Sequence, residues 1–202
     1  MRIEFTEEDR RGLLARVPEF APAVRGMELP HLNVGGDLFH ALCQSIVSQQ
    51  LAVRAAEAIF ARFAELLGEV TPEKLLAADT EALRSCGLSA RKVEYLRGAA
   101  EAATSGKIDF AALASAPDET VVEALTALKG VGVWTAEMLL IFALGRRDVL
   151  STGDLGIRRG LEIVFGKAGF SEAELQELRR RVSPYGTLAA LYLWRIKDAA
   201  KK

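Results

Sequence analysis

Cysteine is scarce in this sequence, since the 202 residues include only Cys43 and Cys86. Two cysteines without a CxxC pair or a Cys/His cluster do not make a disulfide framework, a zinc site or an iron–sulfur site. Histidine is equally rare, and His31 and His40 have no partner at a metal-ligand spacing. We therefore expect two reduced thiols in a cytoplasmic protein, with no cofactor and no metal held by side chains.

Long apolar runs are also missing. The segment "MLLIFAL" at 138–144 is far shorter than the ~20 apolar residues of a membrane span, so it is predicted to be a buried helix. The N-terminal "MRIEFTEEDRRG" lacks the apolar stretch of a secretory signal. Positive charge is not in surplus either, because the formal net charge is −1. A nucleic-acid partner would therefore require locally clustered positive charge.

Alternating strand patterns are nearly absent, whereas helical periodicity runs through most of the chain. The best strand candidate is "RDVLST" at 147–152, which is equally compatible with an extended loop. Two apolar stripes with helical spacing lie within residues 38–68: Leu38, Leu42, Ile46 and Val47 in the first, and Ala55, Ile59 and Phe63 in the second. These patterns predict an all-α fold of many short helices.

Local signals mark several helix ends. Thr71 followed by Pro72, and Ser89 further on, are typical N-terminal caps. Gly68 and Gly106 follow periodic segments, where a glycine commonly ends a helix.

The most specific local pattern joins two helical segments by a glycine-rich turn. Residues 120–128 form an amphipathic helix, "KGVG" interrupts it, and "VWTAEMLLIFAL" begins another. Gly130 and Gly132 permit positive φ and close backbone approach. The N–H groups at the start of the second helix, with Lys129 beside them, would suit a phosphate. An ordinary tight turn between two helices is the alternative.

Four ordered segments spanning 37–194 together resemble one family. The hairpin "LKGVGVWTA" followed by "STGDLGI", and the segments "SIVSQQLAVRAAEAIFARF", "GLSARKVEYLRGAAEAATSGKIDF" and "SPYGTLAALYLW", are similar to motifs of the helix-hairpin-helix base-excision DNA glycosylases. The similarity is greatest to the AlkA-type branch, the 3-methyladenine DNA glycosylases II.

The resemblance implies a fold of two helical lobes with the active site in the cleft between them, and without the N-terminal β-lobe of longer members. Residues 37–145, including the hairpin at 120–145, would form the central lobe. Residues 1–36 and 146–202 would form the second lobe. The resemblance further implies a monomer that binds double-stranded DNA and does not contact a membrane.

The implied reaction is hydrolysis of the N-glycosidic bond of alkylated bases in duplex DNA. The bases would be N3-methyladenine and N7-methylguanine, with N1-methyladenine and N3-methylcytosine as further candidates. The base is flipped out of the stack, and an abasic site remains. Asp154 matches the catalytic carboxylate, which would stabilise the oxocarbenium-like sugar or orient the attacking water. A plain N-terminal helix cap is the alternative role for Asp154.

The base pocket implied by the resemblance is aromatic, as suits a cationic alkylated purine. Trp134 and Trp194 match pocket tryptophans, Met138 occupies a pocket position, and Tyr192 is a further candidate; core packing is the alternative for the aromatic residues. Bifunctional relatives place a Schiff-base lysine where this chain has Trp134. The enzyme is therefore expected to lack AP lyase activity.

DNA contacts are assigned by the same resemblance. Gln50 and Leu51 would form the wedge that fills the gap left by the flipped base, although Leu51 could instead belong to the core. Phosphate contacts are expected at Lys129, Gly130, Gly132, Thr135 and Arg158, with Arg146, Arg147 and Arg159 as weaker candidates that could simply be solvated. The family hairpin often holds a monovalent cation, here at the backbone carbonyls of 128–132.

Three positions depart from the family pattern. Met138 replaces a frequent tyrosine, Gly186 replaces the arginine of "P-x-R-S", and Lys129 replaces a usual proline. Met138 and Gly186 leave open a glycosylase for another lesion, such as uracil or a mismatched base. A non-catalytic helix-hairpin-helix DNA-binding module, and an all-α structural or interaction protein, are the other two alternatives.

Overall fold

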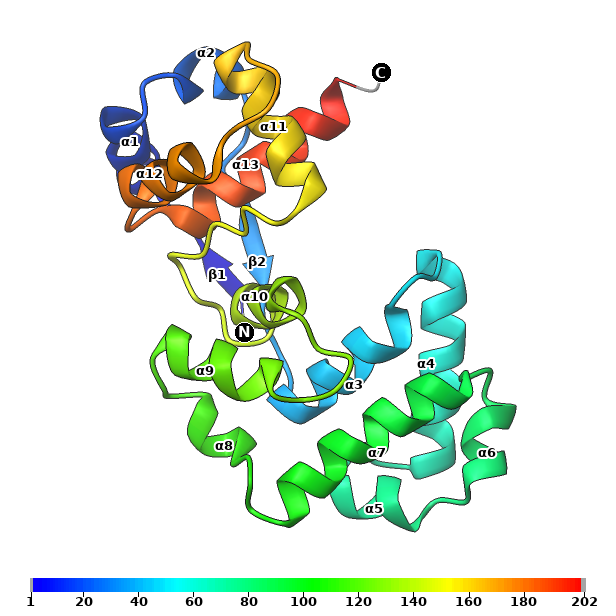
Figure 1. The fold of residues 1–202 in the computed structure, drawn as a ribbon. Helices are drawn as coiled ribbons and strands as arrows, with labels where there is room; N and C mark the ends of the chain where they lie inside the picture. The colour runs from blue at the N-terminus through cyan, green and yellow to red at the C-terminus, as the bar shows by residue number, and fades with distance from the viewer. Residues whose placement is uncertain (1, 201–202) are drawn as a thin grey trace. The chain divides into compact units, whose positions relative to one another are not determined.

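The computed structural model describes residues 2–200, and the chain divides into two compact units (Figure 1). The first unit combines Met1–Gly35 with Leu140–Lys202, and the second consists of Gly36–Leu139. The boundary on the C-terminal side lies inside one helix, Val133–Phe142.

Helices dominate both units, which confirms the predicted all-α class. The described residues form two strands, β1 (Arg2–Glu4) and β2 (His31–Asn33), and thirteen helices: α1 (Glu7–Arg16), α2 (Phe20–Val24), α3 (Leu38–Ser48), α4 (Val53–Leu67), α5 (Pro72–Ala77), α6 (Thr80–Ser85), α7 (Ala90–Thr104), α8 (Phe110–Leu113), α9 (Asp118–Thr126), α10 (Val133–Phe142), α11 (Leu155–Phe165), α12 (Glu172–Val182) and α13 (Gly186–Ala199). Across residues 2–200, the helices are too short or too polar to cross a membrane.

The first unit is built around α13, which packs against α1, α2, α11 and α12. Its core face includes Leu188, Leu193 and Ile196, all buried. The contact with α11 is especially close at Gly160, where a Cβ atom would lie 2.6 Å from the Leu193 carbonyl oxygen. Glycine at 160 therefore allows the two helix backbones to approach more closely than any other residue would permit.

A small antiparallel sheet in the first unit was not predicted. β1 pairs with β2, with Ile3 opposite Leu32. Each strand has three residues, and a segment this short has no room for an alternating pattern. The predicted strand candidate at 147–152 is not a strand, and its alternative, an irregular loop, is what the structure contains.

The second unit is organised around α7, which packs against α3, α5 and α6. Along α3 the predicted stripe is confirmed, because Leu38, Leu42, Ile46 and Val47 are all buried. The stripe predicted for α4 is displaced at its start: Ala55 is exposed, and Ala56 is buried together with Phe63 and Leu67. Of the predicted stripe, Phe63 is buried and Ile59 is half-buried, so the prediction is wrong only at Ala55.

The predicted helix caps are confirmed. The Thr71 hydroxyl accepts a hydrogen bond from the Lys74 N–H at 3.4 Å, and the Ser89 hydroxyl accepts one from the Lys92 N–H at 3.3 Å. Gly68 ends α4 with a φ of 70°, which a residue with a side chain seldom adopts. These signals are local to the chain, so sequence alone was sufficient to place them.

Candidate functional site

Asp154 is the N-cap of α11 in the first unit, and its side chain also reaches a second helix. The Oδ1 atom accepts hydrogen bonds from the Ile157 backbone N–H at 2.8 Å and from the Trp194 indole Nε1–H at 2.9 Å. The first bond is the ordinary capping contact. The second comes from α13, so the position of the carboxylate depends on how α11 and α13 pack.

Trp194 is held against the carboxylate by a stacking contact with Phe142 and by the close approach of the α11 backbone at Gly156. Its ring stacks on Phe142 at the end of α10, with centroids 5.8 Å apart and planes inclined by 27°. A Cβ atom at Gly156 would lie 2.9 Å from Trp194 Cδ1 and 3.0 Å from Asp154 Oδ1. The absence of a side chain at 156 thus makes room for the indole–carboxylate hydrogen bond. Phe142 is 43% exposed and was missed by the sequence analysis, which treated its segment only as a buried helix.

The loop before Asp154 is fixed by the start of α13. The Thr187 hydroxyl donates to the Arg146 carbonyl at 2.7 Å and accepts from the Val149 N–H at 3.1 Å. The Gly186 N–H donates to Asp148 Oδ1 at 2.9 Å, and a Cβ at 186 would lie only 2.9 Å from the Asp148 carbonyl carbon. Position 186 departs from the arginine of the family pattern. Glycine is required there because the Asp148 backbone lies too close to leave room for a side chain.

Two arginines hold the same loop through hydrogen bonds to its carbonyls. Arg158 Nε donates to the Thr152 carbonyl at 2.7 Å, and Arg179 Nε donates to the Leu150 carbonyl at 3.0 Å. Arg158, which was predicted to contact phosphate, is partly buried and uses its Nε to hold the loop that leads to Asp154, and its contact with phosphate stays a prediction.

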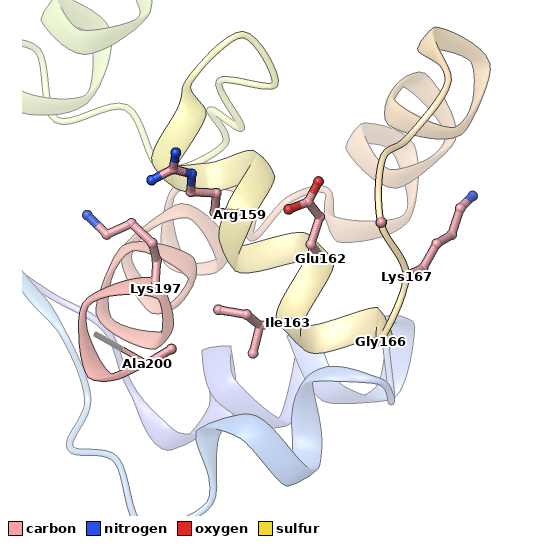
Figure 2. A pocket seen from close by; sticks show the side chains of 8 residues that line it. Arg159, Glu162, Ile163, Gly166, Lys167, Lys197 and Ala200 are labelled. Carbon is pink, nitrogen blue, oxygen red and sulfur yellow. The ribbon is translucent and has the colours of Figure 1, made fainter. Parts of the chain in front are cut away.

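Two of the three weaker arginine candidates, Arg147 and Arg159, have different surroundings. Arg147 forms an ion pair with Asp9, with Nη2 and Oδ2 2.9 Å apart, and its guanidinium lies 4.6 Å from the centre of the Phe5 ring. Arg159 is exposed and lines a groove of about 480 Å³ together with Ile163 and Lys197 (Figure 2). Both side chains are exposed, and Arg147 differs in being engaged with Asp9 and the Phe5 ring.

Tyr192 does not line a surface pocket of its unit. Its side chain is fully buried, and its hydroxyl accepts a hydrogen bond from Arg10 Nε at 2.9 Å. The prediction that Tyr192 contributes to the base pocket is therefore wrong, because the side chain is buried and points from α13 toward α1. Core packing, the stated alternative, is its role.

The hairpin of the second unit joins α9 to α10. Gly130 has a φ of 84°, and a Cβ there would lie 2.1 Å from Tyr95 Cδ2, so both properties expected of a turn glycine are present. Gly132 shows neither, since it lies outside the positive-φ region and nothing would crowd a Cβ. The structure of the protein itself thus explains glycine at 130 but not at 132.

The side chains around the hairpin differ in exposure. Lys129 Nζ lies 2.5 Å from Glu94 Oε1, and this hydrogen bond and the negative charge of Glu94 raise the pKa of Lys129. Trp134 is 48% exposed and Met138 is half-buried. Thr135 is buried, so of its polar groups the backbone N–H in the first turn of α10, rather than the hydroxyl, is the one suited to a phosphate.

The turn between α3 and α4 lies against this hairpin. Gln49 Nε2 donates to the Gly130 carbonyl at 2.9 Å. Gln50 adopts a φ of 58° and is the one residue other than glycine with positive φ among residues 2–200. Leu51 is 38% exposed, so it is not a core residue. A groove of about 1010 Å³ in this unit is lined by the turn, the start of α7 and the hairpin.

Neither cysteine belongs to a cluster of metal-ligating side chains within residues 2–200. Residues 2–200 contain no group of three or more His, Cys, Asp or Glu side chains that could hold a metal ion. Cys43 and Cys86 are both free and buried, and burial raises the pKa of each thiol. Their thiolate forms are therefore disfavoured at neutral pH.

The carbonyls of the hairpin were expected to suit a monovalent cation. Those of Leu128, Gly130 and Gly132 each accept one hydrogen bond, from the Val131 N–H, the Gln49 amide and the Ala136 N–H. A carbonyl oxygen has two lone pairs, so the backbone is compatible with such an ion.

Comparison with known proteins identifies the family. Residues 43–184 match the model of the HhH-GPD superfamily base excision DNA repair proteins, and the chain belongs to this superfamily. The resemblance predicted from the four motifs is thus confirmed.

Individual relatives agree with this assignment. DNA-3-methyladenine glycosylase 1 of Schizosaccharomyces pombe is 39% identical over 168 residues, covering 80% of this chain and 73% of the relative. The crystal structure of a DNA-3-methyladenine glycosidase from Bacillus halodurans is similar with a TM-score of 0.88 and 37% identity, covering 100% of this chain and 94% of that one. The 3-methyladenine DNA glycosylase of Schizosaccharomyces pombe in complex with abasic DNA is similar with a TM-score of 0.79 and 34% identity, covering 93% and 95% of the two chains.

Proposed function

We propose that this protein is a DNA glycosylase that releases alkylated bases from duplex DNA. The observation that carries the proposal is the carboxylate of Asp154, whose Oδ1 accepts two hydrogen bonds at the N-terminus of α11. The names of its relatives, which include DNA-3-methyladenine glycosylases, support alkylated bases as the substrate class. The preferred bases would be N3-methyladenine and N7-methylguanine, with N1-methyladenine and N3-methylcytosine as further candidates.

The proposed chemistry needs a fixed negative charge. Breaking the N-glycosidic bond builds positive charge on the sugar, and a preorganised carboxylate stabilises that charge or orients the attacking water. The N–H groups of Ile157 and Trp194 both donate to Oδ1 of Asp154, so they would hold the carboxylate in position for this role. Water adds to the sugar carbon and loses a proton to the Asp154 carboxylate or to solvent, the base departs with the electrons of the N-glycosidic bond, and an abasic site remains.

A second acidic group is not required for a cationic leaving base. An N3- or N7-alkylated purine already carries positive charge, so it can depart without a proton from a general acid. Such a base is also attracted to aromatic faces, by about 0.5–2 kcal/mol for each contact. The half-exposed ring of Trp134 and the partly exposed ring of Trp194 would each offer such a face.

The second unit would bind the DNA. Leu51, with its exposed apolar side chain beside Gln50, would fill the space left by the flipped base. The backbone N–H groups at the start of α10, the turn glycines and Lys129 would contact phosphate. Lys129 must first exchange its ion pair with Glu94 for the phosphate, an exchange between exposed charges that costs little.

The enzyme is proposed to be monofunctional. A lyase reaction through a Schiff base requires a nucleophilic amine, and Trp134 stands where bifunctional relatives have lysine. Lys92 is turned toward the carbonyls of Val47 and Gln49. Borohydride treatment during base release should therefore trap no covalent protein–DNA complex, and the abasic product should keep an intact strand.

A substrate panel tests the proposed function. Duplexes containing N3-methyladenine, N7-methylguanine, uracil or a mismatched base are incubated with the protein, and free bases are separated by chromatography. Release of the methylated purines is the expected result. Release of uracil or the mismatched base alone would reassign the lesion, and binding of every duplex without release would indicate a non-catalytic DNA-binding module.

A further inference from the structure

Lys92 lies in the first turn of α7, where a positive charge is unfavourable. The N-terminal end of a helix carries partial positive charge, so its own dipole disfavours an ammonium group there. The side chain is partly buried, and desolvation lowers the pKa of Lys92. The helix that carries Lys92 therefore offers no electrostatic reason for a lysine at this position.

The compensating contacts come from a different helix. Lys92 Nζ donates to the Val47 carbonyl at 2.7 Å and to the Gln49 carbonyl at 2.8 Å. Val47 is in the last turn of α3 and Gln49 is its C-cap, so both carbonyls belong to the partly negative end of that helix. Lys92 thus acts as a C-terminal cap for α3, supplied from elsewhere in the second unit.

The residues that follow α3 need outside support. We call Gln49–Leu51 the wedge turn. Within it, the Gln49 N–H reaches the Ile46 carbonyl at 3.4 Å and the Leu51 N–H reaches the Ser48 carbonyl at 3.2 Å, both longer than a typical backbone hydrogen bond. Gln50 has a φ of 58°, which is unfavourable for a residue with a side chain. Local backbone bonds alone are therefore weak restraints on this turn.

Lys92 also belongs to a chain of contacts that ends at the hairpin. The Gln49 carbonyl accepts a hydrogen bond from Lys92 Nζ, and the Gln49 side-chain amide donates one to the Gly130 carbonyl. Gly130 in turn lies against Tyr95, one turn after Lys92 on α7. Lys92, Gln49 and Gly130 thereby connect the wedge turn to the phosphate-binding hairpin within one unit.

We infer that Lys92 is a positioning residue that holds the wedge turn so that Leu51 can enter the DNA stack. The inference rests on the proposed function, because it gives Leu51 a wedge role. Lys92 acts through backbone carbonyls and need not touch the substrate. Direct phosphate binding by Lys92 is the competing role, since its ammonium has a third N–H and it lines the groove of the second unit.

The test compares Lys92→Met, which keeps an apolar stem but removes the ammonium, with Lys107→Met. Lys107 is an exposed lysine of the same unit, so the control removes an equal charge away from the turn. Hydrogen exchange of the Leu51 amide without DNA should be about tenfold faster in Lys92→Met and unchanged in Lys107→Met. Equal exchange in the two variants would overturn the inference.

Single-turnover base release from methylated duplex DNA provides the second readout. Lys92→Met should slow release by about tenfold, and the double variant with Leu51→Ala should be no slower than the slower single variant. Multiplicative effects in the double variant would show that Lys92 acts independently of the wedge. The slope of log affinity against log salt should be unchanged, whereas a decrease of about one would assign Lys92 to phosphate instead.

The two readouts separate the inference from the proposed function. If the wild-type protein released no base from any duplex of the panel, the proposed glycosylase activity would fail. The exchange of the Leu51 amide would still decide whether Lys92 orders the wedge turn, because that measurement needs neither DNA nor activity.

Discussion

The two units place their candidate functional residues in contrasting ways. In the first unit, Asp154 and Trp194 hydrogen-bond to each other where two helices approach closely, and glycines at 156 and 160 make that approach possible. In the second unit, Leu51 and Trp134 present apolar surface to solvent. Substitutions near the carboxylate should therefore alter packing and chemistry together, whereas those at the exposed residues should alter function with little change in stability.

Gly160 offers the largest stability effect. Gly160→Ala brings a methyl group to within 2.6 Å of the Leu193 carbonyl oxygen. Both the methyl group and that oxygen are attached directly to helix backbone, so neither can move aside easily. We expect a loss of roughly 1–3 kcal/mol in the free energy of unfolding, measured by denaturant titration.

Gly98 provides the matched control for this substitution. It is also a helical glycine, in α7, but nothing would lie within 4 Å of a Cβ atom at this position. Gly98→Ala should stabilise the protein by about 0.5–1 kcal/mol, because alanine is the better helix former. Equal effects at 98 and 160 would contradict close packing of α11 on α13.

Gly156 links packing to chemistry. Gly156→Ala introduces a methyl group 2.9 Å from Trp194 Cδ1 and 3.0 Å from Asp154 Oδ1, so the indole and the carboxylate must separate. Base release under single-turnover conditions should fall by about 100-fold, since a displacement of about 1 Å can have that effect. Unchanged release with unchanged stability would show that the Trp194–Asp154 contact is not needed.

Trp194→Phe removes the N–H donor and keeps an aromatic ring next to Phe142. Loss of one hydrogen bond to a charged acceptor should slow base release by about tenfold or more. Trp134→Phe is the comparison in the second unit, where the free energy of unfolding should change by less than about 0.5 kcal/mol. A larger loss of stability in the Trp134 variant would remove the contrast between the units.

The smallest effect is expected at an exposed ion pair of the first unit. Hydrogen bonds from Lys167 and from Ser171 lower the pKa of Glu174 from 4.5 to about 2. Because the folded pKa lies below the unfolded one, this contribution to stability is present above pH 4.5 and is lost as the pH falls toward 2. The melting temperature of Glu174→Gln should therefore vary less than that of the wild type between about pH 5 and pH 2, and salt at about 1 M should reduce the difference.

Sequence was sufficient where the determining contacts were local. The caps at Thr71 and Ser89 and the buried stripe of α3 were predicted because each depends on residues within one or two turns. The stripe of α4 was misplaced at Ala55, because the direction of burial is set by the helices packed around α4 rather than by periodicity alone.

Contacts between distant segments could not be predicted. Tyr192 and Trp194 lie two residues apart on the same helix, and periodicity could not show that they have different roles. Tyr192 hydrogen-bonds to Arg10, whereas Trp194 hydrogen-bonds to Asp154. The structural role of Arg158 and the contribution of Phe142 likewise depend on which segments meet after folding. Asp154 was singled out only through its family resemblance, since its local pattern equally fits an ordinary helix cap.

The most direct test of the central claim is base release from methylated duplex DNA by the wild type and by Asp154→Asn, with DNA affinity measured on the same duplex. Asparagine keeps an oxygen that can accept from Ile157 and Trp194 but lacks the negative charge. Release should fall by about 100- to 1,000-fold while affinity changes little. Release at the wild-type rate by the variant would contradict a catalytic role for the Asp154 carboxylate.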